Sequence, residues 1–398
     1  MTKVWAGVDA GKSAHHCVVI NEDGDRLLSR RVVNNEPDLL QLIDDVRALA
    51  TDVQWAIDLN CGGAGLVLAA LAANGQRVVY IPGRVIYHAA AGYRGEGKTD
   101  AKDAAIIADQ ARIRRDLRAF APADDVTAAL RMLTSHRYDR MRARTGTINR
   151  LRALLGECFP ALERELNLAN SKATLILLTG YQSPAAIRRM GQSRLEAWLK
   201  RRKVRGGAAT LADRAVRAAH SQSVAVPGDA VAGRLIAALA RCILDIEGEL
   251  ADLDRQITEV FREHRYAEII ESMPGFGPLL GAELLAATGG GIGVFENANR
   301  LAAMSGLAPV PKDSGRVSGN LHRPRRYDRR LMRVFYISSQ LSARYDPSSD
   351  AYYRRKRAEG KRHTQAVIAL ARRRVDVLWA MLRDERKYTI TPREALAA

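Results

Sequence analysis

"VWAGVDAGKSAHHCVVINEDGDRLLSRRVVN", residues 4–34, decides the fold, because it contains three apolar runs of strand length. We predict strands at residues 4–10, 14–20 and 26–33. The second and third are joined by Asn-Glu-Asp-Gly-Asp, and Asp-Gly is a strong signal for a hairpin turn. The chain is therefore expected to begin with three strands, the last two forming a hairpin.

Helices and strands alternate in the residues that follow. We predict a helix over 36–50 with Pro37 in its first turn, a strand over 53–58, a helix over 64–75 and a strand over 77–81. After a loop that includes residues 93–99, a helix is predicted from Asp100 to about residue 117. The order β-β-β-α-β-α-β-α is that of a ribonuclease-H-like fold, a mixed sheet with helices on its faces.

Four aspartates occupy matching positions in this order. Asp9 ends the first strand, Asp58 ends the fourth, and Asp100 and Asp103 share one face at the start of the last helix. Acids in a first helical turn are also favoured by the helix dipole alone. In this topology, however, the two strand ends are neighbours and the helix packs across them. Four carboxylates repel unless divalent cations neutralise them, and an all-oxygen set suits Mg²⁺ or Mn²⁺, ions used in phosphodiester chemistry.

The composition favours a polyanionic partner. The 398 residues carry a formal net charge of +18, and nucleic acid is the leading candidate. No apolar run approaches the roughly 18 residues of a membrane span, and the N-terminus lacks a signal-peptide core, so a cytoplasmic, nucleoid-associated protein without a membrane partner is expected. The cysteines at 17, 61, 158 and 242 form no CxxC pair and are interpreted as reduced thiols.

Residues 121–265 are expected to be helical. A heptad seam is predicted in 231–261, and a similar stripe runs through 127–156; the residues are Leu235, Leu239, Cys242, Ile246, Leu250, Leu253, Ile257 and Val260, and then Met141, Ile148, Leu151 and Leu155. The two helices can pair as an antiparallel coiled coil or supply a dimer interface, and an ordinary helical bundle explains the pattern equally well. Between them, "KRRKVR" at 200–205 lies in a basic helical insertion with a Gly-Gly break, and it can contact phosphates or form a solvated face.

Residues 266–398 carry two further motifs. "MPGFGP" at 273–278 resembles the hairpin of a helix-hairpin-helix, in which Gly275 and Gly277 expose backbone N–H groups to phosphate; a plain Gly-rich helix connection is the alternative. Downstream, a loop with Ser314-Gly315 and Ser318-Gly319 precedes a basic run with interleaved tyrosines. Its nucleic-acid-binding candidates are Arg323, Arg325, Arg326, Arg329 and Arg330. Arginines beside an exposed hydroxyl suit a strand-transfer site, although Ser-Gly pairs are common in turns. The final helix, 360–385, is expected to pack as core.

Together these motifs resemble the IS110 family of insertion-sequence transposases, which includes the Piv-type DNA invertases. The resemblance rests on "GVDAGK" (7–12), "WAID" (55–58), "KTDAKDA" (98–104), "MPGFGP" (273–278), "KDSG" (312–315) and "GNLHRPRRYDRRLMRVFYISS" (319–339). It implies an α/β plus all-α chain with three parts. These are a RuvC-like domain over 1–120, a coiled-coil region with the basic insertion over 121–265, and a C-terminal transposase domain with a helix-hairpin-helix over 266–398.

The resemblance also implies a chemistry. Asp9, Asp100 and Asp103 match three acids of the family's Asp-Glu-Asp-Asp set, and Asp58 stands where the family usually has glutamate. Ser314 matches the nucleophile, with Ser318 as the alternative. The implied reaction is strand exchange between donor and target DNA through a 5′-phosphoserine intermediate, guided by a noncoding bridge RNA. It takes place in a homo-oligomer, a dimer or a tetramer in which the serine of one subunit completes the acidic site of another.

Two other functions fit the same residues. A RuvC-like nuclease or junction resolvase would hydrolyse DNA with metal-activated water, and Ser314 would be a turn residue. A non-catalytic nucleic-acid-bridging protein would keep the coiled coil and an inactive acidic site, for which Asp58 in place of glutamate is an argument. A covalent protein–DNA adduct distinguishes the recombinase from both.

Overall fold

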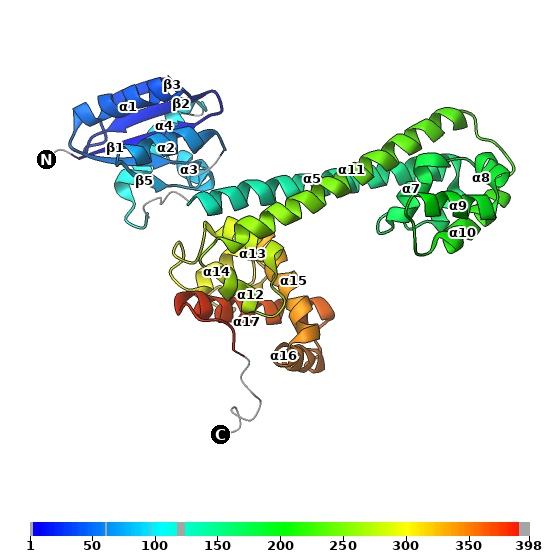
Figure 1. Cartoon of the computed structure of the whole chain (residues 1–398). Coiled ribbons are helices and arrows are strands. Elements are labelled where there is room, and N and C mark those ends of the chain that lie inside the picture. Colours follow the sequence, from blue (N-terminus) through cyan, green and yellow to red (C-terminus); the bar gives the residue numbers. More distant parts are fainter. Residues whose placement is uncertain (1–2, 60–61, 96, 118–123, 390–398) are drawn as a thin grey trace. The chain divides into compact units, whose positions relative to one another are not determined.

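The computed structural model describes residues 3–59, 62–95, 97–117 and 124–389. The chain forms two compact units, Met1–Pro122 and Ala123–Ala398, the first mixed α/β and the second mostly helical (Figure 1). The domain boundary predicted at 120/121 and Cys61 lie outside the described residues. The boundary predicted at 265/266 falls within the second unit and stays a prediction.

The first unit is built on a five-stranded sheet in the order β3-β2-β1-β4-β5. Its strands are β1 (Lys3–Ala10), β2 (Ala14–Ile20), β3 (Arg26–Val33), β4 (Asp52–Ile57) and β5 (Arg77–Tyr80). β1 pairs antiparallel with β2 and parallel with β4, and β4 pairs parallel with β5. The five strands predicted from sequence are confirmed, as is the hairpin between β2 and β3.

Helices cover both faces of this sheet. One core contains Val8, Trp55 and residues of α1 (Glu36–Leu49) and α2 (Gly65–Ala73), which follows the short 3-10 helix η1 (Gly62–Ala64). The other contains Trp5, Ala56 and residues of α3 (Gly83–Ala90) and α4 (Asp100–Ile113). Because side chains alternate between the faces of a strand, Asp9 shares its face with Trp5 and therefore lies on the α4 side.

Two details of this unit differ from prediction. The sequence analysis assigned no element to residues 83–92, yet α3 is present, with only Ile86 buried among its side chains. The prediction that the next helix runs to about residue 117 is wrong, since α4 ends at Ile113. Ile113 is already 52% exposed, and Leu117 reaches the core of this face without a further helical turn. Arg114 instead has extended backbone and pairs with Asp116 at 2.6 Å.

The second unit contains two long helices, α5 (Asp125–Cys158) and α11 (Asp229–Arg262), that pack against each other. Three ion pairs join them: Arg137–Asp254, Arg140–Glu249 and Arg144–Glu247, at 2.5, 2.6 and 2.6 Å. Residue numbers rise along one helix as they fall along the other. The helices therefore form an antiparallel pair within one chain, the first of the alternatives left open by the sequence.

The predicted seam is confirmed in the second half of α11 and only in part in the first. Ile246, Leu250, Leu253 and Ile257 are buried, as predicted. Upstream, Leu239 is half-buried against the core, but the buried residues are Ile236, Ala237, Ala240 and Ile243, and Leu235 and Cys242 are exposed. The seam there is displaced by one residue because this part of α11 also packs against α7 (Lys172–Gly180), which widens and rotates its buried face. On α5, Met141 is likewise 37% exposed.

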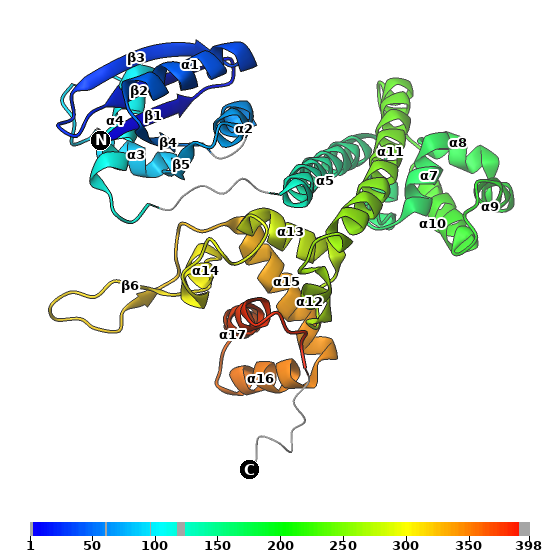
Figure 2. The ribbon, with the colours of Figure 1, turned by 60° about the vertical axis from the view of Figure 1, so that its left-hand side comes forward.

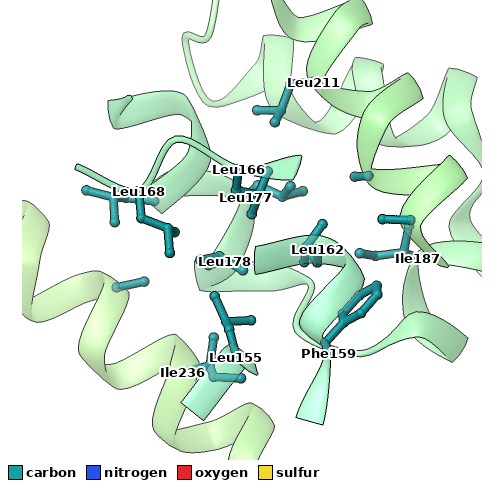
Figure 3. Packing of buried hydrophobic residues seen from close by; sticks show 14 of the residues in the cluster. Leu155, Phe159, Leu162, Leu166, Leu168, Leu177, Leu178, Ile187, Leu211 and Ile236 are labelled. Carbon is teal, nitrogen blue, oxygen red and sulfur yellow. The ribbon is translucent and has the colours of Figure 1, made fainter. Parts of the chain in front are cut away.

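Short helices fill the connection between α5 and α11. They are α6 (Pro160–Glu165), α7, α8 (Pro184–Met190), α9 (Gln192–Arg201) and α10 (Ala208–His220). Their core includes Phe159, Leu162 and Leu178, together with Leu155 from α5 and Ile236 from α11 (Figure 3). We call residues 159–228 the helical insertion. The predicted Gly-Gly break, Gly206-Gly207, separates α9 from α10.

A second core includes the other ends of α5 and α11, with Leu130, Ile257 and Phe261. The remaining elements surround it: α12 (Ala267–Ser272), α13 (Pro278–Thr288), α14 (Ala298–Met304), β6 (Val310–Pro311), β7 (Leu321–His322), α15 (Arg329–Tyr345), α16 (Pro347–Ala358) and α17 (His363–Arg383). α17 buries Val375 and Leu378, so the final helix is core as predicted. No helix in the described part of the chain has the length and apolarity needed to cross a membrane.

Candidate active site

Asp9 and Asp58 are neighbours at the end of the sheet. Val8 of β1 lies beside Ile57 of β4 in the parallel register, so the residues that follow each of them are adjacent. The backbone N–H of Ala10 donates to Oδ1 of Asp58 at 3.4 Å, which ties the two strand ends together. The expectation that these strand ends meet is confirmed.

Helix α4 brings the other two acids to this edge. Thr99 caps the helix by accepting from the N–H of Lys102, and Asp100 and Asp103 lie in its first turn. Gly7 of β1 permits the close approach: a Cβ at that position would lie 2.2 Å from the carbonyl oxygen of Ala104 and 2.4 Å from the nitrogen of Ala108. Backbone thus packs on backbone, and any side chain at position 7 would separate α4 from the sheet.

The electrostatics show that the four acids act on one another. The pKa of Asp9 is raised to about 6, first by burial and then by the negative charges of Asp58, Asp100 and Asp103. Burial also raises the pKa of Asp58, to which the charge of Asp103 adds, while the N–H of Ala10 opposes the rise. Lys98 lowers the pKa of both carboxyls and is the nearby cation that partly offsets their charge.

Three of these acids border a cleft of about 700 Å³. Asp9, Asp58 and Asp103 contribute to its lining, together with Lys98 and Lys102. Helix α3 supplies another part of the wall, including Ile86 and the 76% exposed Tyr87. Sequence reasoning missed these wall residues because a short amphipathic stretch such as "GRVIYHAA" gives little helix signal, whereas the two lysines stand inside the recognised motif "GKTDAKD".

A second residue missed by sequence reasoning is His16. It lies opposite Asp9 in the antiparallel pair of β1 and β2, and its ring nitrogen Nε2 is 3.0 Å from Oγ of Ser29. Burial lowers the pKa of His16, while the charge of Asp100 raises it. His16 is therefore part of the same electrostatic neighbourhood.

The acids do not form a compact metal-ligand group as they stand. Among the described residues, no three Asp, Glu, His or Cys side chains are placed to hold one metal ion. The structure thus brings the predicted acids to one end of the sheet without drawing their oxygens into a single coordination shell.

Ser314 lies in a separate element, the β6–β7 hairpin of the second unit. Ser314 and Val317 exchange backbone hydrogen bonds of 2.9 Å across the tip, and Asp313 accepts from the N–H of Asn320. Residues 311–320 are all exposed, including Ser318. Figure 2 shows the hairpin projecting from the helices of its own unit. Within the described residues, the Ser314 hydroxyl has no hydrogen-bond partner, so no general base is supplied by the hairpin itself.

The predicted arginines divide into two groups. Arg330 is half-buried: its guanidinium donates to Oγ of Ser135 at 3.3 Å and lies 5.3 Å from the centre of the Tyr138 ring. Arg323 donates to the hydroxyl of Tyr327. By contrast, three arginines are exposed and make no ion pair with any described residue: Arg325, Arg326 and Arg329. The charges of these three arginines are therefore not neutralised by an acid of the described residues.

The two predicted glycines of "MPGFGP" differ in surroundings. Gly275 has a φ of +83°, and a Cβ there would lie 2.3 Å from the carbonyl oxygen of Ser338 on α15, so glycine is required for packing. Gly277 caps α13 and has open space around it. Arg374, buried at 3% exposure, fastens this turn by donating to the carbonyl of Pro274 and to Oγ of Ser338, at 2.5 and 2.6 Å.

Comparison with known proteins gives consistent matches over nearly the whole chain. A family model for the DEDD transposases of IS110 matches residues 6–160, and a model for transposases of the IS116/IS110/IS902 family matches residues 267–354. The 42 kDa protein of insertion element IS900 from Mycobacterium paratuberculosis is 58% identical over 97% of each chain. The 44.8 kDa protein of IS116 from Streptomyces clavuligerus is 51% identical over 98% of this chain and 97% of its own. The 43.6 kDa protein of IS110 from Streptomyces coelicolor is 38% identical over 96% and 94%. The chain therefore belongs to the IS116/IS110/IS902 family of insertion-sequence transposases.

Proposed function

We propose that this transposase exchanges DNA strands through a covalent serine intermediate, assisted by divalent metal at a RuvC-like acidic site. The observation that carries the proposal is the mutual effect of four carboxylates at one end of the sheet, where Asp58, Asp100 and Asp103 all raise the pKa of Asp9. A fold gains nothing from such repulsion by itself. Strained electrostatics of this kind are typical of sites that bind a cation or move a proton.

The acidic site fits a hard divalent cation in its donor chemistry. Its carboxylates offer only oxygen, and their charge, which Lys98 offsets only in part, is what such an ion would neutralise. Asp9, Asp58, Asp100 and Asp103 would hold Mg²⁺ or Mn²⁺, with water completing the shell of a set that is too dispersed to do so alone. Bound there, the ion would stabilise charge on the scissile phosphate. Asp58, with a shorter side chain than glutamate, is suited to contact through water.

Ser314 is proposed as the nucleophile. Its Oγ would lose its proton and attack the phosphorus, the bond from phosphorus to the 3′-oxygen would break, and the departing 3′-hydroxyl would take up a proton. The DNA would then be joined to Ser314 through its 5′-phosphate. In the second step, a 3′-hydroxyl of the partner strand would attack the same phosphorus and release the serine. The exposed hairpin leaves Ser314 accessible to DNA, and Arg325, Arg326 and Arg329 are free to hold phosphates beside it.

The proposed partners are nucleic acids and further copies of the chain. Donor and target DNA are the substrates, and a noncoding bridge RNA is proposed as the guide, supported by the net charge of +18 and by the resemblance. We propose that Gly277 of a helix-hairpin-helix presents backbone N–H groups to phosphate, with Gly275 shaping the turn. A homo-oligomer, dimeric or tetrameric, is proposed as the active form.

The test is adduct formation. Purified protein is incubated with Mg²⁺, its co-purified RNA and labelled element-junction DNA, and a denaturing gel is inspected for label that migrates with protein. We expect an adduct that is absent in Ser314→Ala and in Asp103→Asn and retained in Ser318→Ala, the matched hydroxyl in the same hairpin. Cleavage without any adduct would support the nuclease instead. Binding without cleavage or adduct would support an inactive bridging protein.

A further inference from the structure

The helical insertion presents an unusual concentration of positive charge between α9 and α10. We call residues 200–207 the basic loop; its cations are Lys200, Arg201, Arg202, Lys203 and Arg205, all exposed. Only Val204 points inward, with 6% exposure. The basic loop thus exposes its charged side chains and buries one apolar side chain.

The backbone of the basic loop is firmly held. The N–H of Val204 donates to the carbonyl of Leu199 at 3.1 Å, and that of Lys203 donates to the carbonyl of Lys200 at 3.0 Å. This pattern is the Schellman ending of a helix, in which an apolar residue closes the turn. The guanidinium of Arg202 lies 3.9 Å from the centre of the Trp198 ring, which packs against Tyr181. The charges are therefore displayed on a preorganised surface.

Lys203 occupies a position that normally belongs to glycine. Its φ is +65°, and Lys203 and Glu385 are the two non-glycine residues with positive φ in the described part of the chain. The residue after a helix in a Schellman ending is usually glycine, because a side chain is strained in the left-handed region. A lysine there sacrifices stability while adding one more cation. Strained backbone positions often belong to functional sites, so the strain at Lys203 suggests that its charge serves a function such as binding.

A solvated helix end explains only part of this charge. Lys200 pairs with Glu196 at 2.6 Å, and cations in the last turn of α9 are favoured by the helix dipole. The helix dipole does not explain the charges of Lys203 and Arg205, because both residues lie beyond the end of α9. Neither they nor Arg201 form an ion pair with a described residue, so three like charges remain side by side without compensation.

We propose that the basic loop docks on the phosphate backbone of double-stranded DNA without reading its bases. Three uncompensated cations on a fixed surface suit phosphates, which position a protein on DNA. Proteins that bind single-stranded nucleic acid usually offer exposed aromatic rings on which the bases stack. The aromatic ring at this loop, Trp198, is only 9% exposed and lies beneath Arg202, so a single strand is a poorer fit. Duplex DNA is favoured over RNA because DNA is what a transposase acts on.

This contact is separate from the proposed serine chemistry and does not depend on it. Leu130 belongs to the C-terminal core and Leu151 to the core of the insertion, and they lie about 30 Å apart along α5. The basic loop would therefore add a second DNA contact, at the end of the α5–α11 pair that carries the helical insertion.

The test compares two full-length variants of equal charge. The loop variant is Arg201→Gln/Lys203→Gly/Arg205→Gln. The control is Arg217→Gln/Arg255→Gln/Arg300→Gln, whose arginines are 66, 73 and 70% exposed but pair with acids three or four residues earlier in the chain. Binding to labelled duplex DNA, of element-junction and of unrelated sequence, and to an RNA duplex of matched sequence is measured by fluorescence anisotropy over a range of salt concentrations.

We expect the loop variant to bind both DNA sequences about 10-fold more weakly, with a salt slope smaller by about 2 to 3, while the control stays near wild type. Lys203→Gly alone should raise the melting temperature while weakening binding, which excludes misfolding as the cause. Equal DNA binding by the loop and control variants would overturn the proposal. So would a loss confined to a matched RNA duplex. Ser314→Ala should bind DNA like wild type, so failure of the serine chemistry would be seen separately.

Discussion

Replacing Gly7 by alanine should move the acids of α4 away from the sheet. The new Cβ would lie 2.2 Å from the carbonyl oxygen of Ala104, where ordinary contacts begin near 3.4 Å, so α4 must retreat by about 1 Å. Both neighbours at this contact are backbone and cannot swing aside. Overpacking of this kind costs about 3 kcal/mol, which for a unit of this size lowers the melting temperature by about 10 °C.

The same displacement should reduce catalysis beyond its effect on stability. Asp100 and Asp103 move with α4, whereas Asp9 and Asp58 stay with the strands. A misplacement of about 1 Å can lower a rate about 100-fold. The rate of adduct formation should therefore fall by about two orders of magnitude at a temperature where Gly7→Ala remains folded, as judged by circular dichroism.

Gly65→Ala is the matched control. Gly65 begins α2 in the same unit, and a Cβ there would meet nothing within 4 Å. This variant should keep the wild-type melting temperature and rate. If Gly7→Ala melts and reacts like wild type, the close approach of α4 to β1 is not what places the acids. If it melts lower yet reacts normally when folded, the approach serves stability alone.

Three further predictions concern charge. The folded pKa of Asp9, about 6, exceeds its ordinary value of 3.8, so in the metal-free protein the contribution of Asp9 to stability is full below about pH 4, falls as pH rises to about 6 and then levels off. In EDTA, the difference in melting temperature between wild type and Asp9→Asn should therefore change against wild type as the pH rises from 4 to 6, and above pH 6 added Mg²⁺ should raise the wild-type melting temperature most. Arg374→Met should lower the free energy of unfolding in urea by about 3 kcal/mol, because the Pro274 carbonyl and the Ser338 hydroxyl lose a buried donor. The half-buried pair Arg144–Glu247 should show a coupling of about 1 kcal/mol in a double-mutant cycle, and no coupling would mean that the pair is fully screened.

Much of the first unit could be predicted because its signals are local. Strand periodicity and the Asp-Gly turn locate β1 to β3, and the parallel pairing of β1 with β4 then places Asp9 beside Asp58. Helix α3 was missed because it is only eight residues long, too short for its amphipathic pattern to be told from a loop. The surroundings of Gly275 depend on α15, more than sixty residues away in sequence, and no local pattern encodes such a contact.

The seam of α11 shows a different limit. Leu235 and Ile236 are both apolar, and either can continue the heptad from Ile246. The choice is made by α7, which packs against that part of the helix. For Ser314, the sequence predicts an exposed turn, and the structure agrees. Its role as a nucleophile rests on the family resemblance, because an exposed hydroxyl without a partner has no distinctive local chemistry.

The antiparallel pairing of α5 and α11 has a consequence for how relatives can diverge. The helical insertion begins and ends at the same end of this pair, so residues can be gained or lost within 159–228 without changing which residues of α5 and α11 face each other. A single residue inserted in α5 between Arg137 and Arg144 is different, because it rotates all later residues of the helix by about 100° about the helix axis. Such an insertion would carry Arg144 away from Glu247 while leaving Arg137 in place. Length variation among relatives should therefore collect between the two helices and spare the helices themselves.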